Sequence, residues 1–212
     1  MNNIAIFGDS FSDPSLPVNN YSAWPELLSN NFSITNYSKH GSSLWWAYEQ
    51  FKQHKDSYDY CIFTITLPGR LFLKSLNQHI TFAESGWPMA HGINLGKTWF
   101  KYFYDKEREE VFHNFIVDDI LKTPNTLVVP AFAESVHAYS GWTLCHLSDL
   151  ERNHYKRPTI SPDEKRKCHL TKENNLVVYN KILSALDNKD LLLTLTEADY
   201  VVPKDPAHFY WF

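Results

Sequence analysis

Glycine is scarce in this chain of 212 residues, which contains only 7. Loops that cradle phosphates need closely spaced glycines, and neither G-x-G-x-x-G nor G-x-x-x-x-G-K-[ST] occurs. Cysteine is also rare. Cys61, Cys145 and Cys168 are odd in number and widely spaced, which suggests neither a disulfide framework nor a cysteine-rich zinc site and fits a reducing compartment.

Positive charge is not in excess either, because Lys and Arg number 20 against 24 Asp and Glu. A net charge of -4 argues against nucleic acid as a partner bound through a basic face. No run approaches the roughly 18 apolar residues of a membrane helix, so no membrane partner is expected. No secretory signal is visible, so we expect a cytoplasmic protein. The ten histidines show no H-x-x-x-H spacing, and we expect neither a metal nor another cofactor.

Apolar residues make up 43% of the chain, enough for one well-packed domain spanning residues 1–212. Short apolar runs alternate with amphipathic segments, a pattern typical of a parallel sheet with helices on both faces. The predicted strands are residues 4–7, 34–37, 60–66 and 126–130, with a fifth possible strand after residue 191. The predicted helices are residues 23–28, a segment capped by Ser42 and Ser43, residues 106–122, and a segment capped by Thr171.

In the helix predicted over 106–122, the apolar side chains repeat at helical spacing; they are Val111, Phe112, Phe115, Ile116 and Ile120. Between about residues 131 and 166 the periodicity dissolves. We interpret this stretch as a long loop insertion close to the functional site.

Ligands of open parallel sheets bind beyond the carboxyl ends of the strands, so the residues after each strand are the candidates for chemistry. The first strand leads into Gly8-Asp9-Ser10-Phe11-Ser12, the second into a segment containing Gly41, and the third into Thr66-Leu67-Pro68-Gly69-Arg70. A tight turn after Gly8 can lift the Ser10 hydroxyl out of the sheet and direct backbone N–H groups at an oxyanion. Taken alone, Gly-Asp-Ser is also an ordinary turn sequence.

The combination of an N-terminal strand, Gly-Asp-Ser-Phe-Ser and a glycine after the second strand resembles the SGNH, or GDSL-like, hydrolases. The resemblance implies a three-layer α/β/α fold of flavodoxin-like type with a mostly parallel sheet. It also implies that Ser10 is the nucleophile and that the N–H groups of Ser10 and Gly41 belong to the oxyanion hole. Asp9 would be the structural aspartate of the motif.

The general base of that family is a histidine just before the last helix, and His169 stands there, ahead of the cap at Thr171. The family's aspartate three residues earlier is replaced by Arg166, so Asp163 or Glu164 from the same loop is the candidate third member. A Ser-His dyad is the other possibility. A literal Asp-x-x-His occurs at Asp205 and His208, without a following helix, and is the alternative base pair.

The family's Gly-x-Asn-Asp block after the third strand is also missing. Thr66 or Arg70 stands in its place as a third oxyanion donor, and Arg70 is equally a candidate anchor for a substrate carboxylate. Loss of one oxyanion donor typically costs about 10²–10³ in rate, so a replacement or a weak enzyme is expected.

The resemblance therefore implies a serine esterase that cleaves carboxylic esters through an acyl-enzyme. Five tryptophans suit a sugar platform and favour O-acetyl groups on carbohydrates as substrates; they are Trp45, Trp46, Trp87, Trp99 and Trp142. Two alternatives stay open on the same fold: a non-catalytic binding module, and an acyltransferase that uses the same serine.

Overall fold

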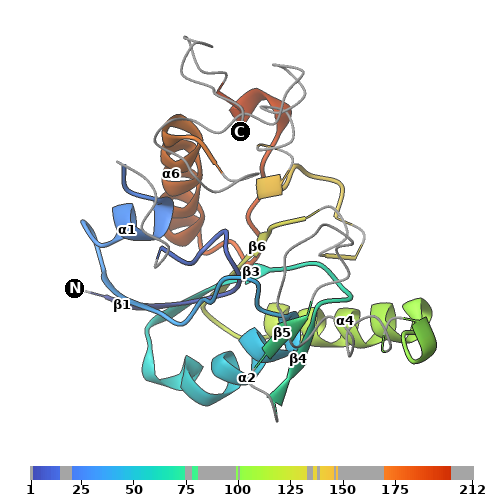
Figure 1. Ribbon diagram of the computed structural model, residues 1–212. Helices are drawn as coiled ribbons and strands as arrows, with labels where there is room; N and C mark the ends of the chain where they lie inside the picture. The colour runs from blue at the N-terminus through green and yellow to red at the C-terminus, as the bar shows by residue number, and fades with distance from the viewer. Residues whose placement is uncertain are drawn as a thin grey trace.

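The computed structural model is built around one sheet of four parallel strands in the order β2-β1-β3-β6 (Figure 1). These strands are β1 (Asn3–Phe7), β2 (Ser33–Asn36), β3 (Tyr60–Ile65) and β6 (Thr126–Pro130). The structure describes residues 2–14, 21–74, 78–80, 99, 101–132, 136–137, 139–145, 147 and 170–201.

Helices cover both faces of the sheet. Helices α1 (Trp24–Leu28) and α6 (Lys172–Asn188) pack on one face, while α2 (Leu44–His54) and α4 (Lys106–Leu121) pack on the other (Figure 1). Alternate residues of β1 enter the two cores: Ile4 and Ile6 pack with Trp24, whereas Ala5 and Phe7 pack with Phe51. Because both faces are buried, the strands are continuous apolar runs. The predicted three-layer α/β/α fold of flavodoxin-like type is confirmed.

The strand order brings three loops to one place. After β1 the chain adds β2 on one side of it, and β3 then pairs with β1 on the other side. The direction in which successive strands are added to the sheet therefore reverses at β1. Ile6 is in register with Asn36 of β2, and Phe7 is in register with Phe63 of β3. The segments that follow these three strands therefore leave the sheet side by side.

The predicted helix caps are confirmed at two positions. The Ser43 hydroxyl accepts a hydrogen bond from the N–H of Trp46, and the Thr171 hydroxyl accepts one from Asn174. Ser42 plays a different part, because its hydroxyl donates to the Gly8 carbonyl oxygen at 2.8 Å. One of the two serines thus starts a helix while its neighbour ties the β2 loop to β1.

Helix α4 differs from the expectation in the face that it buries. Of its five regularly spaced apolar side chains, Ile116 and Ile120 reach the core, whereas Val111, Phe112 and Phe115 point to solvent. His113 is buried in their stead. The repeat of apolar residues in the sequence predicted the helix correctly, but the rotation of the helix about its own axis is set by packing against β6.

Other elements were not expected or are reduced. An antiparallel pair, β4 (Leu71–Leu73) and β5 (Gln78–Ile80), follows β3, and two short 3₁₀ turns cover Lys55–Ser57 and Glu197–Asp199. The possible fifth strand is a single parallel bridge between Leu192 and Val128 of β6. No helix in the described ranges is long and apolar enough to cross a membrane.

Candidate functional site

Ser10 lies in a tight turn directly beyond the end of β1, and its side chain is largely buried. The turn is held by Asp9, whose Oδ1 accepts from the N–H of Phe11 at 3.1 Å and whose carbonyl oxygen accepts from the N–H of Ser12 at 3.1 Å. Such side-chain to backbone bonds are how Asp stabilises a turn. The position of Ser10 is therefore imposed by hydrogen bonds on both sides of it.

Gly8 allows the turn to start because no other residue fits there. Its φ is +149°, and a Cβ at this position would lie 2.6 Å from Ser12 Oγ and 2.7 Å from Thr64 Cβ. These distances are far inside van der Waals contact, and Thr64 is a fully buried strand residue that has little room to shift.

Gly8→Ala is accordingly expected to lower the free energy of unfolding by roughly 2–4 kcal/mol, from overpacking together with an unfavourable φ. Urea denaturation followed by circular dichroism measures this loss. Gly41→Ala is the matched control, because Gly41 also has positive φ but nothing lies within 4 Å of its Cβ position. Equal destabilisation by both changes would contradict a steric role specific to Gly8.

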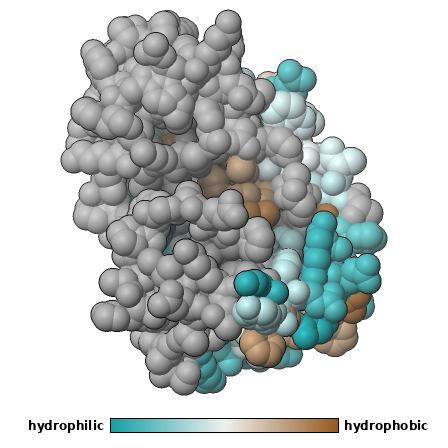
Figure 2. Space-filling model, turned by 45° about the vertical axis from the view of Figure 1, so that its right-hand side comes forward, coloured by the Kyte–Doolittle hydropathy of each residue, from teal (hydrophilic) through white to brown (hydrophobic). Residues whose placement is uncertain are grey.

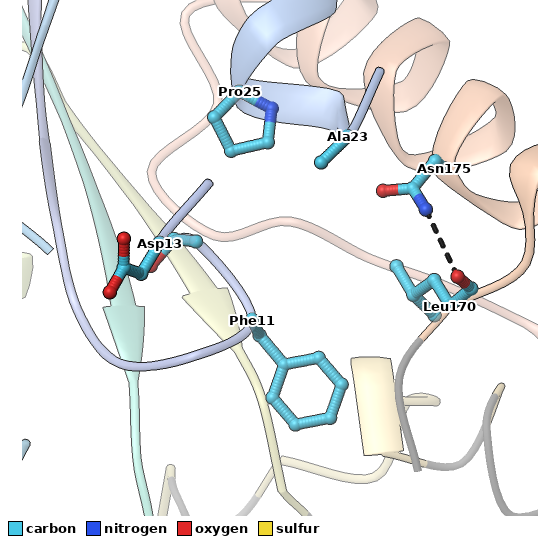
Figure 3. A pocket seen from close by; sticks show the side chains of 7 residues that line it. Phe11, Asp13, Ala23, Pro25, Leu170 and Asn175 are labelled. Atoms are coloured by element: carbon cyan, nitrogen blue, oxygen red, sulfur yellow. Dashed lines mark hydrogen bonds between the residues drawn. The ribbon is translucent and has the colours of Figure 1, made fainter. Parts of the chain in front are cut away.

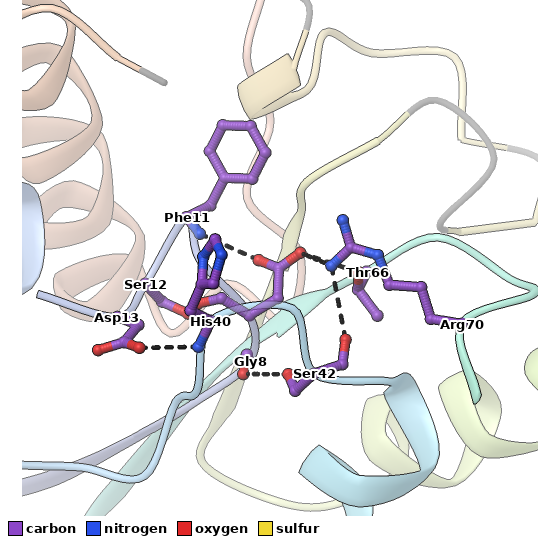
Figure 4. Close-up of polar contacts among 9 residues, drawn as sticks. Gly8, Phe11, Ser12, Asp13, His40, Ser42, Thr66 and Arg70 are labelled. Carbon is purple, nitrogen blue, oxygen red and sulfur yellow. Dashed lines mark hydrogen bonds and ion pairs between the residues drawn. The ribbon is translucent and has the colours of Figure 1, made fainter. Parts of the chain in front are cut away.

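The loop after β2 is bonded to the end of β1. The carbonyl oxygen of Gly8 accepts two hydrogen bonds from this loop. One comes from Ser42 Oγ at 2.8 Å (Figure 4), and the other comes from the N–H of Lys39 at 3.1 Å. Gly41 lies between these two contacts, with a φ of +70° and open space where a side chain would be. A ligand can therefore approach the backbone at Gly41 closely.

The segment after β3 contacts the same turn through Asp9. Thr66 Oγ1 donates to Asp9 Oδ2 at 2.8 Å, and Arg70 Nη1 donates to the same oxygen at 2.7 Å (Figure 4). Asp9 is completely buried, so its charge needs both the counter-charge and the hydrogen bonds that it receives. Asp9 thereby joins the loops of β1 and β3.

Arg70, a candidate oxyanion donor or carboxylate anchor, thus binds a carboxylate of its own chain. Its Nη1 also lies 3.5 Å from the Ser42 carbonyl oxygen, while Nη2 and Nε make no hydrogen bond to the described residues. The guanidinium stands 5.3 Å from the ring centroid of Phe132, and Phe132 packs edge-on against Phe11. Both aromatic contacts limit the movement of Arg70.

A shallow open hollow lies on the other side of the Ser10 turn, with a volume of about 10 Å³, close to that of one water molecule (Figure 3). Its walls come from the turn, from α1 and from the start of α6; they are Phe11, Ser12, Asp13, Ala23, Pro25, Leu170 and Asn175. Asp13 is tied to the β2 loop, since its Oδ2 accepts from the N–H of His40 at 2.7 Å. The hollow is smaller than the roughly 300–1,000 Å³ of pockets for drug-sized ligands.

The sequence-predicted base and its partners lie outside the described residues; these are Asp163, Glu164, His169, Asp205 and His208. The described chain resumes at Leu170, which is buried and lines the hollow together with Ser12. Its carbonyl oxygen accepts from Tyr21 Oη at 2.9 Å and from Asn175 Nδ2 at 3.2 Å. At the other end, the backbone N–H of Val201 donates to Asn174 Oδ1.

The structure brings together the loops that hold Ser10, Gly41, Thr66 and Arg70, because Gly8 is bonded to Ser42 and Asp9 is bonded to Thr66 and Arg70. It also adds residues that sequence reasoning missed, namely Asp13, Phe132 and the wall of the hollow. Asp13 had one usable signal, because a carboxylate six residues after a strand end is expected to need a partner when buried. Phe132 had none, since its contact with Arg70 depends on β6 lying beside β3.

Other nucleophiles and ligand sets are less favourable. Burial raises the pKa of the Cys61 thiol to about 11, so the thiol is protonated at neutral pH and unreactive there. Within the described ranges, no group of three or more His, Cys, Asp or Glu side chains is arranged to hold a metal ion. Ser10 is thus the better-placed nucleophile of the two.

No known family model matches this sequence, and no curated protein is significantly similar to it. The fold class follows from the coordinates alone. Any assignment of activity has to come from the geometry of the turn around Ser10 and from the chemistry of its neighbours.

Proposed function

We propose that this protein is a serine hydrolase of the SGNH type that cleaves carboxylic esters through an acyl-enzyme. The observation that carries the proposal is the convergence of three loops on one turn. Gly8 is bonded to the β2 loop, Asp9 is bonded to Thr66 and Arg70 after β3, and Ser10 follows these two anchored residues directly. Catalysis of acyl transfer needs such a rigidly held hydroxyl beside hydrogen-bond donors.

In the proposed reaction, Ser10 Oγ attacks the ester carbonyl carbon while a histidine takes the hydroxyl proton. The tetrahedral oxyanion accepts hydrogen bonds from the N–H groups of Ser10 and Gly41. The histidine then donates its proton to the leaving alcohol, which breaks the ester bond and leaves Ser10 acylated. Water, activated by the same histidine, releases the acid and restores the serine.

Arg70 is the better candidate than Thr66 for the third oxyanion donor. The hydroxyl hydrogen of Thr66 is used in its bond to Asp9, whereas Arg70 retains N–H groups on Nη2 and Nε. A charged donor stabilises a developing oxyanion more strongly than a neutral one. This arrangement compensates for the missing asparagine after β3.

His169 is the proposed general base because of where the chain lies next to it. Consecutive Cα atoms are about 3.8 Å apart, so His169 is tethered within one residue of Leu170, which lines the hollow beside the Ser10 turn. Asp163 or Glu164 is the proposed orienting group. His208 with Asp205 remains the alternative, on a tether of seven residues from Val201, which is bonded to the start of α6.

A short acyl group on a sugar is the proposed substrate. The hollow beside the Ser10 turn is too small for a long acyl chain, which favours the shortest acyl groups. Trp46 is the tryptophan best placed for a sugar platform, because Lys39 from the β2 loop stands 5.7 Å from its ring centroid. Aromatic rings near such a loop provide stacking surfaces.

A fluorophosphonate probe followed by intact-mass measurement tests the proposed nucleophile. Such a probe reacts covalently only with an activated serine, so we expect one adduct on the wild type and none on Ser10→Ala. Ser38→Ala is the matched control. Ser38 is another serine at this sheet edge, its hydroxyl is buried without a hydrogen-bond partner among the described residues, and its removal should leave labelling unchanged.

Folded wild-type protein that acquires no adduct would contradict the hydrolase and favour the non-catalytic binding module. If an adduct forms, product analysis with and without an acceptor alcohol separates hydrolysis from acyl transfer. Transfer to the alcohol in preference to water would identify an acyltransferase that uses the same serine.

A further inference from the structure

We propose that the exposed face of α4 is the interface of a homodimer in which the α4 helices of two copies pack antiparallel. This inference is independent of the proposed hydrolase activity, because α4 contributes no residue to the turn around Ser10. It rests on three properties of the face: its exposed apolar area, the spacing of its residues, and the charges at its two ends.

The exposed apolar side chains gather around α4. Val111 is 70% exposed and Phe115 is 72% exposed, and both lie on the side of the helix opposite to its buried residues. Trp45 of α2 extends the surface, because its ring lies 5.5 Å from that of Phe112. Tyr102 and Phe103, just before α4, are also more than half exposed. Figure 2 shows apolar side chains in brown among hydrophilic ones in teal on the side where α4 lies.

The area of this surface is large for a monomer. A large aromatic side chain buries about 150–250 Å² when covered. The residues of this surface are between 41% and 72% exposed and together present roughly 500–700 Å² of apolar surface; they are Trp45, Tyr102, Phe103, Val111, Phe112 and Phe115. The largest apolar patch on a typical monomer is about 300–600 Å². A stable interface needs about 800 Å² per partner, which this patch and its polar rim together can supply.

The exposed residues of α4 follow a coiled-coil spacing. Intervals of three and four residues alternate along one stripe, which consists of Arg108, Val111, Phe115, Asp118 and Lys122. All five are exposed. Its two apolar residues, Val111 and Phe115, are four residues apart at the centre of the stripe, where they can pack against a second helix, and charged residues flank them.

Charge determines the direction of packing. In an antiparallel pair, the two α4 helices can cross at the level of His113, which itself stays buried on the other face of each helix. Residues equally far along the helix from this level then face each other, so Val111 meets Phe115 of the second copy. Arg108 then meets Asp118 of the second copy, and the two-fold axis repeats this ion pair. A parallel pair would instead place Arg108 against Arg108 and Asp118 against Asp118, which is repulsive.

The two charged residues are available for these contacts. Asp118 makes no ion pair or side-chain hydrogen bond with the described residues, and it is exposed. Arg108 uses Nη2 to contact the Phe103 carbonyl oxygen and Glu109 Oε1, both at 3.1 Å, which leaves its other N–H donors for a partner. The guanidinium is therefore positioned at the rim of the apolar stripe.

Sedimentation equilibrium of the full chain over a range up to roughly 100 µM tests the proposal. We expect the wild type to be dimeric and Phe115→Glu to be monomeric. Leu176→Glu is the matched control, since Leu176 is a half-exposed leucine on α6, in the other helix layer, and its replacement should leave the dimer intact. Circular dichroism establishes that each variant is folded.

A charge swap tests the antiparallel register. Arg108→Asp and Asp118→Arg should each weaken dimerisation by about tenfold, and the double variant should restore the wild-type dissociation constant. Wild-type protein that stays monomeric at the highest concentration overturns the proposal and leaves the face to a partner of different sequence. A dimer that survives Phe115→Glu, or a double variant no better than the single ones, also overturns it.

Discussion

We expect Ser10→Ala to reduce kcat/KM for p-nitrophenyl acetate by roughly 10³–10⁶, because the acyl-enzyme route ends when its nucleophile is removed. The hydrogen bonds that shape the turn come from Asp9 and from the backbone, so the variant should keep the fold. Steady-state hydrolysis measures the loss. A short and a long acyl chain should both be compared, since the small hollow predicts that acetate is the better substrate.

A control variant and two histidine variants show whether the loss of activity is specific to Ser10 and which histidine is the base. Ser38→Ala should retain wild-type rates, because its hydroxyl makes no hydrogen bond within the part of the chain that the structure describes. His169→Ala should be as inactive as Ser10→Ala, whereas His208→Ala should stay active. If His208→Ala is the inactive histidine variant, the assigned base is wrong and the class of enzyme stands. Full activity of both Ser10→Ala and the histidine variants would exclude a serine hydrolase.

Arg70→Met is expected to lower the free energy of unfolding by about 3–5 kcal/mol, the usual cost of removing one partner from a buried ion pair. Asp9 is fully buried, and the Arg70 guanidinium 2.7 Å away is the cation that offsets its charge. Methionine keeps most of the side-chain volume and the contact with Phe132, so the loss reports the charge. Urea denaturation at neutral pH gives the value.

The double variant Asp9→Asn/Arg70→Met provides the control for this ion pair. With both charges gone, the amide oxygen at position 9 can still accept from the Phe11 N–H, and the amide NH₂ can donate to the Thr66 hydroxyl oxygen, so the double variant should be more stable than Arg70→Met alone. Strictly additive losses would show that Arg70 and Asp9 do not act as a pair. A loss below about 1 kcal/mol for Arg70→Met would place the guanidinium among ordinary surface charges.

The four parallel strands could be predicted from the sequence because each is an apolar run buried on two faces. Residues 4–7 and 126–130 admit no other interpretation at their length, and the observed strands differ from the predictions by one residue at most at either end. Helix starts were equally accessible. A hydroxyl at Ser43 or Thr171 serves the first turn of the helix that follows it, which is a purely local interaction.

The outward face of α4 could not be predicted in the same way. Val111 and Phe115 are apolar and recur at the spacing of core residues, so the sequence pattern predicts that they are buried. The helix instead buries His113 and Val117, because its rotation depends on the surface that β6 and its neighbours offer. The same limit applies to the candidate site, where Ser10, Gly41 and Arg70 were predicted as strand-end residues, while the pairing of Arg70 with Asp9 was not.

The sequence by itself determined the order of strands and helices, their caps and the residues that end each strand, because these depend on apolar periodicity and on bonds between near neighbours. Only the tertiary structure decided which carboxylate Arg70 binds, which side of α4 faces solvent and where a hollow opens beside Ser12. Those features join segments tens of residues apart. Their energies depend on distances that exist only after the sheet and its two helix layers have formed.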